Sequence, residues 1–272
     1  MFVRVDDLEV FVHERAPDSA GPDPDPAAPV AVLIHGNWST HRWWLPFSEA
    51  IAGELPQLRI LAPDLRGRGD TRGPDSGYAI PELAADLIGL LDALALPRVH
   101  LVGHSLGTAV VMETALALAR VGQPDRIASL TCVAPAWVDG MPSRWHRADV
   151  QQQVQDDIAL FARMLEPMAP TAPRDAFWQE LVTTGHRQRW RATRANLDAL
   201  AIWQPGDALQ SLTMPRLVID GEDDPLCGGE VARRAAEALD CERVCLPGIG
   251  HSPNLEAPLD LAELVADLIR QA

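Results

Sequence analysis

Short apolar runs alternate with helix-like segments along most of this 272-residue chain, and this alternation restricts the folds that it can adopt. The runs are Val30–Ile34, Leu58–Ala62, Val99–Val102, Ile127–Val133 and Arg216–Ile219. Between two of them, Pro81–Leu94 carries leucines at helical spacing and a proline in its first turn. Strands separated by amphipathic helices predict an α/β fold, with a mostly parallel sheet and helices on both faces. Ligands of such sheets bind beyond the carboxyl ends of the strands.

The two ends of the chain extend this pattern. Residues 2–5 and 8–12 alternate in polarity around Asp6-Asp7 and predict an N-terminal hairpin, followed by an exposed loop at 16–29 that is rich in Pro, Asp and Ala. At the other end the predicted elements are a helix, a strand and a last helix, at Glu230–Leu239, Arg243–Leu246 and Leu259–Ile269.

The alternation stops between about residues 136 and 208. Three helix-like stretches occur there without a convincing strand, at Ala148–Leu165, Arg174–Thr183 and Gln188–Ala201. We therefore expect residues 1–135 and 209–272 to form the core and residues 136–208 to form an inserted helical cap.

Composition excludes several classes of function. The formal net charge of -15 argues against nucleic acid or an anionic membrane as a partner, because both are bound by clustered basic side chains. The chain has no Lys, so it has no Schiff-base or lysine-nucleophile chemistry. No run is long enough to span a membrane, and the start does not resemble a signal peptide. We expect a cytoplasmic monomer or homodimer that acts on a small molecule.

The four cysteines give no metal-binding pattern. Cys132, Cys227, Cys241 and Cys245 include no CxxC pair and have no histidine at zinc-finger spacing. We expect reduced thiols, no metal and no cofactor.

Gly103-His104-Ser105-Leu106-Gly107 stands where a predicted strand meets a predicted helix. A serine on a sharp strand-to-helix turn, flanked by glycine two residues before and after, is typical of a nucleophile elbow. A serine hydroxyl reacts at neutral pH only if a base and an anion site lie next to it.

Candidates for the missing groups follow Ser105 in the order that this chemistry requires. The strand Arg216–Ile219 leads into the acidic turn Asp220-Gly221-Glu222-Asp223-Asp224-Pro225, and the strand Arg243–Leu246 leads to Gly250-His251. Ser, then Asp, then His is the order of a hydrolase triad on a parallel sheet.

The chain resembles the capped serine hydrolases of the α/β-hydrolase fold over nearly its whole length. The resemblance rests on five ordered segments: His35-Gly36-Asn37-Trp38, Asp64-Leu65-Arg66-Gly67-Arg68-Gly69, the Ser105 elbow, Gly221-Glu222-Asp223-Asp224 and Gly250-His251. It implies Ser105 as nucleophile, His251 as general base and then acid, and Asp224 as the carboxylate that holds the imidazole. It also implies the backbone N–H groups of Leu106 and Asn37 as the oxyanion hole.

Some of these assignments have alternatives. Asp223 or Asp139 could be the acid instead of Asp224, whereas Asp220 comes too early in its strand. Trp38 replaces Asn37 as oxyanion donor if the loop has another register. We expect Asp64 and the Arg-Gly-Arg-Gly segment after it to stabilise a loop and not to contact substrate.

Eight tryptophans suggest the character of the pocket. They fall in the segment after His35 or in and beside the predicted cap, and none lies in a predicted strand; they are Trp38, Trp43, Trp44, Trp137, Trp145, Trp178, Trp190 and Trp203. We expect Trp38, Trp137 and His104 to line an apolar pocket, while Trp190 and Trp203 hold the cap helices together.

The preferred reaction is hydrolysis of a small or medium, largely apolar ester, thioester or lactone through an acyl-enzyme. Ser105 argues against the dehalogenases and epoxide hydrolases of this fold, which have Asp at the elbow, and Ser252 replaces the Trp that usually follows the histidine in carbon–carbon bond hydrolases. The alternatives are carbon–carbon bond hydrolysis, a cofactor-free lyase or oxygenase reaction, and ligand binding without hydrolysis.

Overall fold

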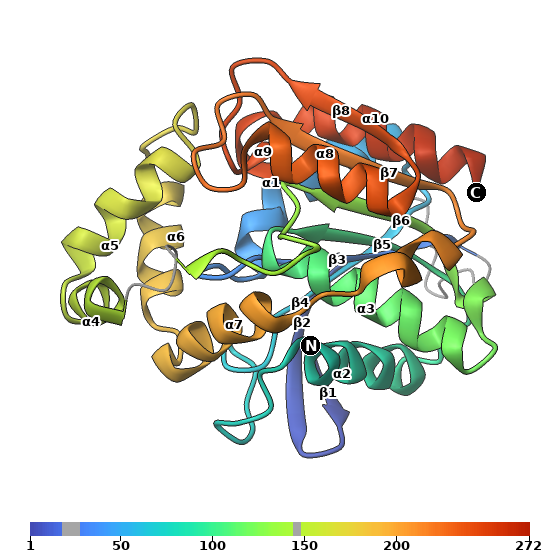
Figure 1. Cartoon of the computed structure of the whole chain (residues 1–272), viewed down its shortest axis with the longest axis horizontal. Helices are drawn as coiled ribbons and strands as arrows, with labels where there is room; N and C mark the ends of the chain where they lie inside the picture. The colour runs from blue at the N-terminus through green and yellow to red at the C-terminus, as the bar shows by residue number, and fades with distance from the viewer. Residues whose placement is uncertain (18–27, 144–147) are drawn as a thin grey trace.

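The computed structural model describes residues 1–17, 28–143 and 148–272, which include one eight-stranded sheet (Figure 1). Its strands are β1 (Phe2–Val5), β2 (Leu8–Arg15), β3 (Val30–Ile34), β4 (Arg59–Pro63), β5 (Val99–His104), β6 (Ile127–Val133), β7 (Arg216–Gly221) and β8 (Glu242–Leu246). They lie in the order β1-β2-β4-β3-β5-β6-β7-β8, with β1 and β2 antiparallel to their neighbours and the others parallel. The predicted α/β fold with a mostly parallel sheet is confirmed.

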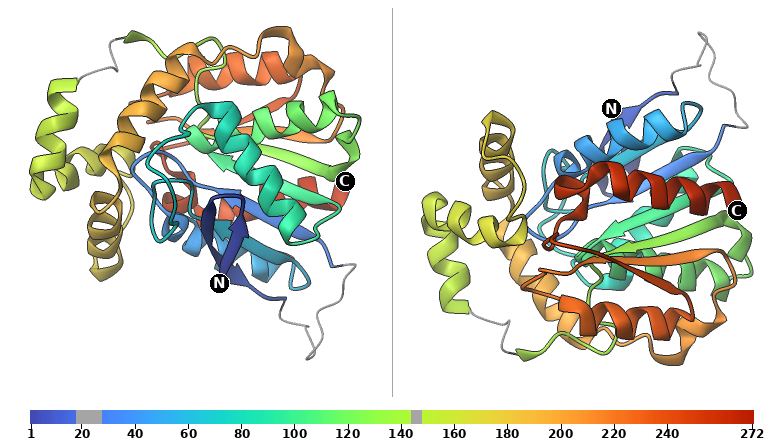
Figure 2. Two further views of the ribbon diagram at one scale, coloured as in Figure 1. Left: turned by 90° about the horizontal axis from the view of Figure 1, so that it is seen from below. Right: turned by 90° about the horizontal axis from the view of Figure 1, so that it is seen from above.

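Helices cover both faces of the sheet because the central strands are apolar on both sides. The helices α1 (Leu45–Glu54) and α10 (Pro258–Gln271) pack together on one face, around Phe47, Ile51 and Val265. The other face is covered by α2 (Ile80–Ala93), α3 (Leu106–Arg120) and α8 (Gly228–Leu239). The two views in Figure 2 show α10 beside α1 and α2 beside α3.

Helices α4 (Ala148–Asp156), α5 (Ile158–Leu165), α6 (Ala176–His186) and α7 (Trp190–Ile202) stand between β6 and β7 in the chain. In Figure 1, α4, α5 and α6 lie at the side of the molecule opposite the C-terminus. They have an apolar cluster of their own, which includes Phe161, Trp178 and Leu181. We call residues 148–208 the inserted segment.

Short elements connect these helices and strands. They are η1 (His41–Trp44), η2 (Pro124–Arg126), η4 (Glu166–Met168), η5 (Gly206–Ser211) and α9 (Pro253–Glu256).

One predicted helix is in fact two helices, so the prediction of a single element is wrong. The stretch Ala148–Leu165 is divided at Asp157, whose backbone is extended and whose carboxylate accepts from the N–H groups of Ala159 and Leu160. Asp157 is therefore the N-cap of α5, and a capping aspartate starts a new helix where apolar spacing alone predicts continuation. Most of the loop predicted at 16–29 lies outside the described residues, and so does Trp145.

The described ranges hold no helix with the length and apolar character needed to cross a membrane.

Candidate active site

Ser105 occupies the sharp turn that joins β5 to α3. Its backbone has φ 52° and ψ -119°, a strained conformation for a residue with a side chain, and α3 begins at the next residue, Leu106. Hydrogen bonds hold the turn on both sides: the Ser105 N–H donates to the Val133 carbonyl at 3.0 Å, and its carbonyl accepts from Thr108. The serine thus stands at the amino end of a helix, where N–H groups without intrahelical partners favour negative charge.

The flanking glycines are required by close backbone contacts. A Cβ on Gly103 would lie 2.5 Å from the Gly107 carbonyl oxygen, and one on Gly107 would lie 2.2 Å from the Ile34 oxygen. A Cβ on Gly36 would lie 3.0 Å from Cβ of Ser105. The loop after β3 therefore lies directly beside the elbow.

Asp224 and His251 come together from the loops after β7 and β8. Their Oδ2 and Nδ1 atoms are 2.8 Å apart and both side chains are buried. The other oxygen of Asp224 accepts from the N–H groups of Leu226 and Cys227 at 2.8 and 3.1 Å. Burial would raise the pKa of Asp224, but His251 and the hydrogen bonds from the two backbone N–H groups together outweigh burial and hold the pKa below its usual value. A carboxylate so placed fixes the ring orientation of the histidine.

The alternative acids are occupied elsewhere. Asp220 forms a double hydrogen bond with Arg243 at 2.8 and 2.7 Å, and Asp139 pairs with Arg234 at the surface. Asp223 is exposed. Of the four aspartates considered, the structure brings Asp224 to His251.

His104 supports the His251 loop from the elbow. Its Nε2–H donates to the backbone carbonyl of His251 at 2.8 Å, and its ring contacts those of Trp43, Trp44 and His251. Burial lowers the pKa of His104 to about 3, so its ring is neutral at physiological pH. Its Nε2 and its ring contact other residues of the protein, and it also lines the cavity described below.

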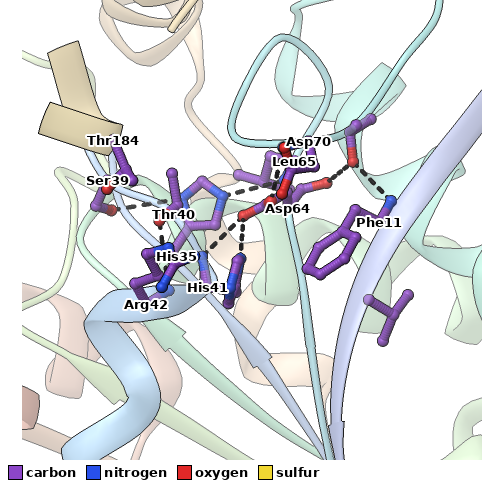
Figure 3. Close-up of polar contacts among 12 residues, drawn as sticks. Phe11, His35, Ser39, Thr40, His41, Arg42, Asp64, Leu65, Asp70 and Thr184 are labelled. Atoms are coloured by element: carbon purple, nitrogen blue, oxygen red, sulfur yellow. Dashed lines mark hydrogen bonds and ion pairs between the residues drawn. The ribbon is translucent and has the colours of Figure 1, made fainter. Parts of the chain in front are cut away.

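A polar network fixes the loop that carries Asn37, which we call the His35 loop (residues 35–40) (Figure 3). Asp64 accepts from the backbone N–H and the ring of His41 at 2.8 and 3.0 Å and from the Asp70 N–H at 3.0 Å. His35 accepts from the Leu65 N–H through Nε2, so its Nδ1–H donates to the Gly36 carbonyl. The prediction that Asp64 stabilises a loop agrees with these contacts.

A cavity of about 370 Å³ adjoins Ser105 and His251. Its wall includes all the predicted pocket residues, Trp38, His104 and Trp137, and both predicted oxyanion residues, Asn37 and Leu106. The inserted segment supplies a further, mostly apolar part: Val150, Gln151, Met164, Leu165, Met168, Leu197 and Leu200. None of the described residues that line this cavity is Asp, Glu or Arg.

The tryptophans divide between this wall and the packing of helices. Trp38 and Trp137 line the cavity, as does Trp43, which sequence reasoning missed. Trp190, in the inserted segment, packs on Trp38 of the His35 loop, and Trp203 donates to the buried Glu113 of α3 at 3.1 Å.

One group of the described residues has atoms placed to hold a metal ion. Ligating atoms of Asp224, Cys227 and His251 lie within 4.8 Å of one another. Burial raises the pKa of the Cys227 thiol well above its usual value, so this thiol is protonated at neutral pH and is a poor metal ligand. The absence of a metal and of a cofactor stays a prediction.

Sequence reasoning also missed the residues from the inserted segment and Arg68. Met164 and Met168 have helical spacing, but spacing alone does not distinguish a wall of a cavity from a helix contact. Arg68 was assigned to loop stabilisation, and its complete burial beside Asn37 becomes visible only in the structure.

Comparison with known proteins gives the family of the chain. Residues 31–264 match the model of the alpha/beta hydrolase family. A protein of Variovorax paradoxus named "Putative carbamate hydrolase RutD" is 31% identical over 252 residues, which cover 84% of this chain and 86% of that protein. The 2-hydroxy-6-oxo-2,4-heptadienoate hydrolase of Pseudomonas putida is 26% identical over 255 residues, 88% of each chain.

Solved structures agree in fold. The esterase of Exiguobacterium antarcticum superposes with a TM-score of 0.83 at 19% identity, covering 99% of this chain and 98% of that one. The resemblance seen in the sequence is thereby confirmed, and the chain belongs to the alpha/beta hydrolase family.

Proposed function

We propose that this hydrolase cleaves small or medium, largely apolar esters, thioesters or lactones through an acyl-enzyme on Ser105. The observation that carries the proposal is the Asp224–His251 hydrogen bond beside a cavity that Ser105 also lines and whose described wall is mostly apolar. A pure binding protein has no need of an oriented imidazole beside a strained serine.

In the first half of the reaction, Ser105 Oγ attacks the substrate carbonyl while His251 Nε2 takes the hydroxyl proton. Asp224 keeps the Nδ1–H of His251 engaged, which leaves Nε2 as the base. The N–H groups of Leu106 and Asn37 receive the negative oxygen of the tetrahedral intermediate. The intermediate collapses when the acyl carbon loses its bond to the ester oxygen or thioester sulfur and His251 gives the proton to the leaving alcohol or thiol.

In the second half, His251 takes a proton from water as the water attacks the acyl carbon. Collapse of the second intermediate returns that proton to Ser105 and releases the carboxylic acid. Each proton is transferred at Nε2, so the cycle needs no further acid or base.

The cavity supports the choice of substrate class. Its volume is near the lower end of the roughly 300–1,000 Å³ range of ligand pockets, and the described part of its wall has no Arg to pair with a carboxylate. We therefore favour neutral acyl groups of moderate length over the carboxylate-bearing substrate in the name of the Pseudomonas putida relative.

A panel of p-nitrophenyl esters tests this choice. We expect kcat/KM to rise from acetate to hexanoate as apolar area is buried, and to fall at dodecanoate because the chain exceeds the cavity. A matched hemisuccinate ester should be hydrolysed at least about tenfold less efficiently than butyrate, since its carboxylate must lose water without gaining a partner. Thioester and lactone substrates of the same acyl length complete the panel.

Two results would count against the substrate class. One is a preference for the hemisuccinate over butyrate. The other is that the protein hydrolyses none of these compounds but cleaves a dienoic acid. That result would favour the carbon–carbon bond reaction.

A further inference from the structure

The guanidinium of Arg68 is buried without a carboxylate partner. Arg68 is 1% exposed, and in the described part of the chain no ion pair joins it to Asp or Glu. Its Nη2 donates to the side-chain oxygens of Asn37 and Asn196, the latter at 2.8 Å, and Nη1 is 3.5 Å from the Gly67 carbonyl oxygen. Its Nε–H has no hydrogen-bond partner among the residues that the structure describes.

Such an arrangement costs stability. Neutral amide oxygens compensate a buried positive charge only in part, and the unpaired Nε–H adds a further penalty. Burial lowers the pKa of Arg68 to about 10, so the group still carries its charge at neutral pH. A side chain that served only to join two loops would do so at lower cost as a neutral residue.

The first amide links Arg68 to the proposed oxyanion hole. Asn37 lines the cavity, and its backbone N–H is one of the two proposed donors. The Asn37 side chain also approaches the inserted segment, with Nδ2 3.4 Å from the Thr193 carbonyl oxygen. The side chain that holds Asn37 is thus positively charged, and it lies behind the place where negative charge would develop.

The second amide links Arg68 to a helix that forms part of the cavity. Asn196 is in α7, and it donates through Nδ2 to the Tyr78 carbonyl at 2.9 Å, which leaves its oxygen for Arg68. Leu197 and Leu200 of the same helix line the cavity. Arg68 therefore stands between the His35 loop and the helix that forms one wall of the cavity.

We propose that Arg68 is a positioning residue for the hydrolytic reaction, which fixes Asn37 against the oxyanion and supplies uncompensated positive charge behind it. The inference rests on the proposed function, because it concerns the oxyanion of that reaction. In a site shielded from water, a charge behind a hydrogen-bond donor stabilises a developing anion more strongly than it would in solvent. Burying the charge lowers the stability of the fold, and the same charge lowers the activation barrier of the reaction.

The test compares Arg68→Met with a matched variant of the same loop, Arg66→Met. Arg66 forms a double hydrogen bond with Asp86 at 2.8 and 2.6 Å, so it is a paired arginine two residues away. For Arg68→Met we expect kcat on p-nitrophenyl butyrate to fall at least about tenfold, KM to change less than about threefold, and Tm to stay within about 3 °C of wild type or to rise. For Arg66→Met we expect the reverse, with Tm about 3 °C or more lower and kcat little changed.

Arg68→Lys checks the contribution of charge, because lysine keeps the charge without the planar fork. Its kcat should lie between those of wild type and Arg68→Met. Three results for Arg68→Met would each overturn the proposal: a fall in kcat of less than tenfold, a Tm more than 3 °C lower, or failure to fold. The first would mean that Arg68 does not contribute to the reaction, and the other two that its role is structural.

Failure of the proposed function is recognised separately. Ser105→Ala is assayed beside the arginine variants. If this variant still turns over the ester, both the acyl-serine mechanism and the inference about Arg68 are wrong. Loss of turnover in Ser105→Ala with unchanged kcat in Arg68→Met overturns the role of Arg68 alone.

Discussion

Ser105→Ala is expected to lower kcat for p-nitrophenyl butyrate at least about a thousandfold, with the fold intact. The substitution removes the one oxygen that can attack the carbonyl from the elbow, while the Asp224–His251 pair and the cavity remain. Residual turnover would come from substrate binding and the oxyanion donors alone. The measurement is steady-state kinetics, with circular dichroism to confirm folding.

Ser252→Ala is the matched control for this prediction. Ser252 is also a serine that lines the cavity, and within the described part of the chain its hydroxyl has no hydrogen-bond partner. Its replacement should leave kcat within about tenfold of wild type, because it contributes neither attack nor proton transfer. If Ser105→Ala kept more than about a tenth of wild-type kcat, Ser105 would not be the nucleophile.

Acidification from pH 7 to pH 5 is expected to lower the free energy of unfolding by several kcal/mol. Three buried histidines are neutral in the folded protein, because burial lowers the pKa of His35 and His100 to about 4 and of His104 to about 3. In the unfolded chain each returns to about 6.5 and takes up a proton at pH 5. Each of the three histidines therefore lowers the free energy of unfolding by about 2 kcal/mol between pH 7 and pH 5.

The sign follows from the lowered pKa values. The unfolded state binds more protons than the folded state in this range, so stability is complete above about pH 6.5 and is lost as the pH falls toward 4. Urea unfolding at both pH values, followed by tryptophan fluorescence, measures the change.

His100→Gln separates this effect from carboxylate titration. His100 lies in β5 with Nδ1 2.8 Å from the Ser129 hydroxyl, and glutamine can also form a hydrogen bond there without titrating. The loss of stability on acidification should be about 2 kcal/mol smaller in this variant. An equal loss in wild type and variant would contradict the account.

The sheet could be predicted because its central strands are buried on both faces. The strands β3 and β6 begin and end at the predicted residues. Pro29 and His35-Gly36 flank β3, whereas Arg126 precedes β6 and Ala134-Pro135 follows it. The strand β2 continues to Arg15, beyond the predicted end at Val12, because its pairing with β4 gives ladder hydrogen bonds to residues of either polarity.

Some residues of the candidate site could be predicted from the sequence and others could not. Ser105, Asp224 and His251 are marked by glycines and by chain order, so they could be named from the sequence, although their roles stay predictions. The family resemblance implied Asp224 as the acid, and the 2.8 Å contact with His251 agrees with Asp224 over its acidic neighbours. Arg68 could not be recognised, because burial without a counterion depends on residues up to 128 positions away in the chain.

The central claim is that Ser105 carries the acyl group, and labelling with a fluorophosphonate tests it most directly. The probe phosphonylates a serine only where a base activates it and an oxyanion hole receives the oxygen. Peptide mapping by mass spectrometry should find one adduct, on Ser105, in the wild type and none in Ser105→Ala. An adduct on another residue, or none on the folded wild-type protein, would contradict the account.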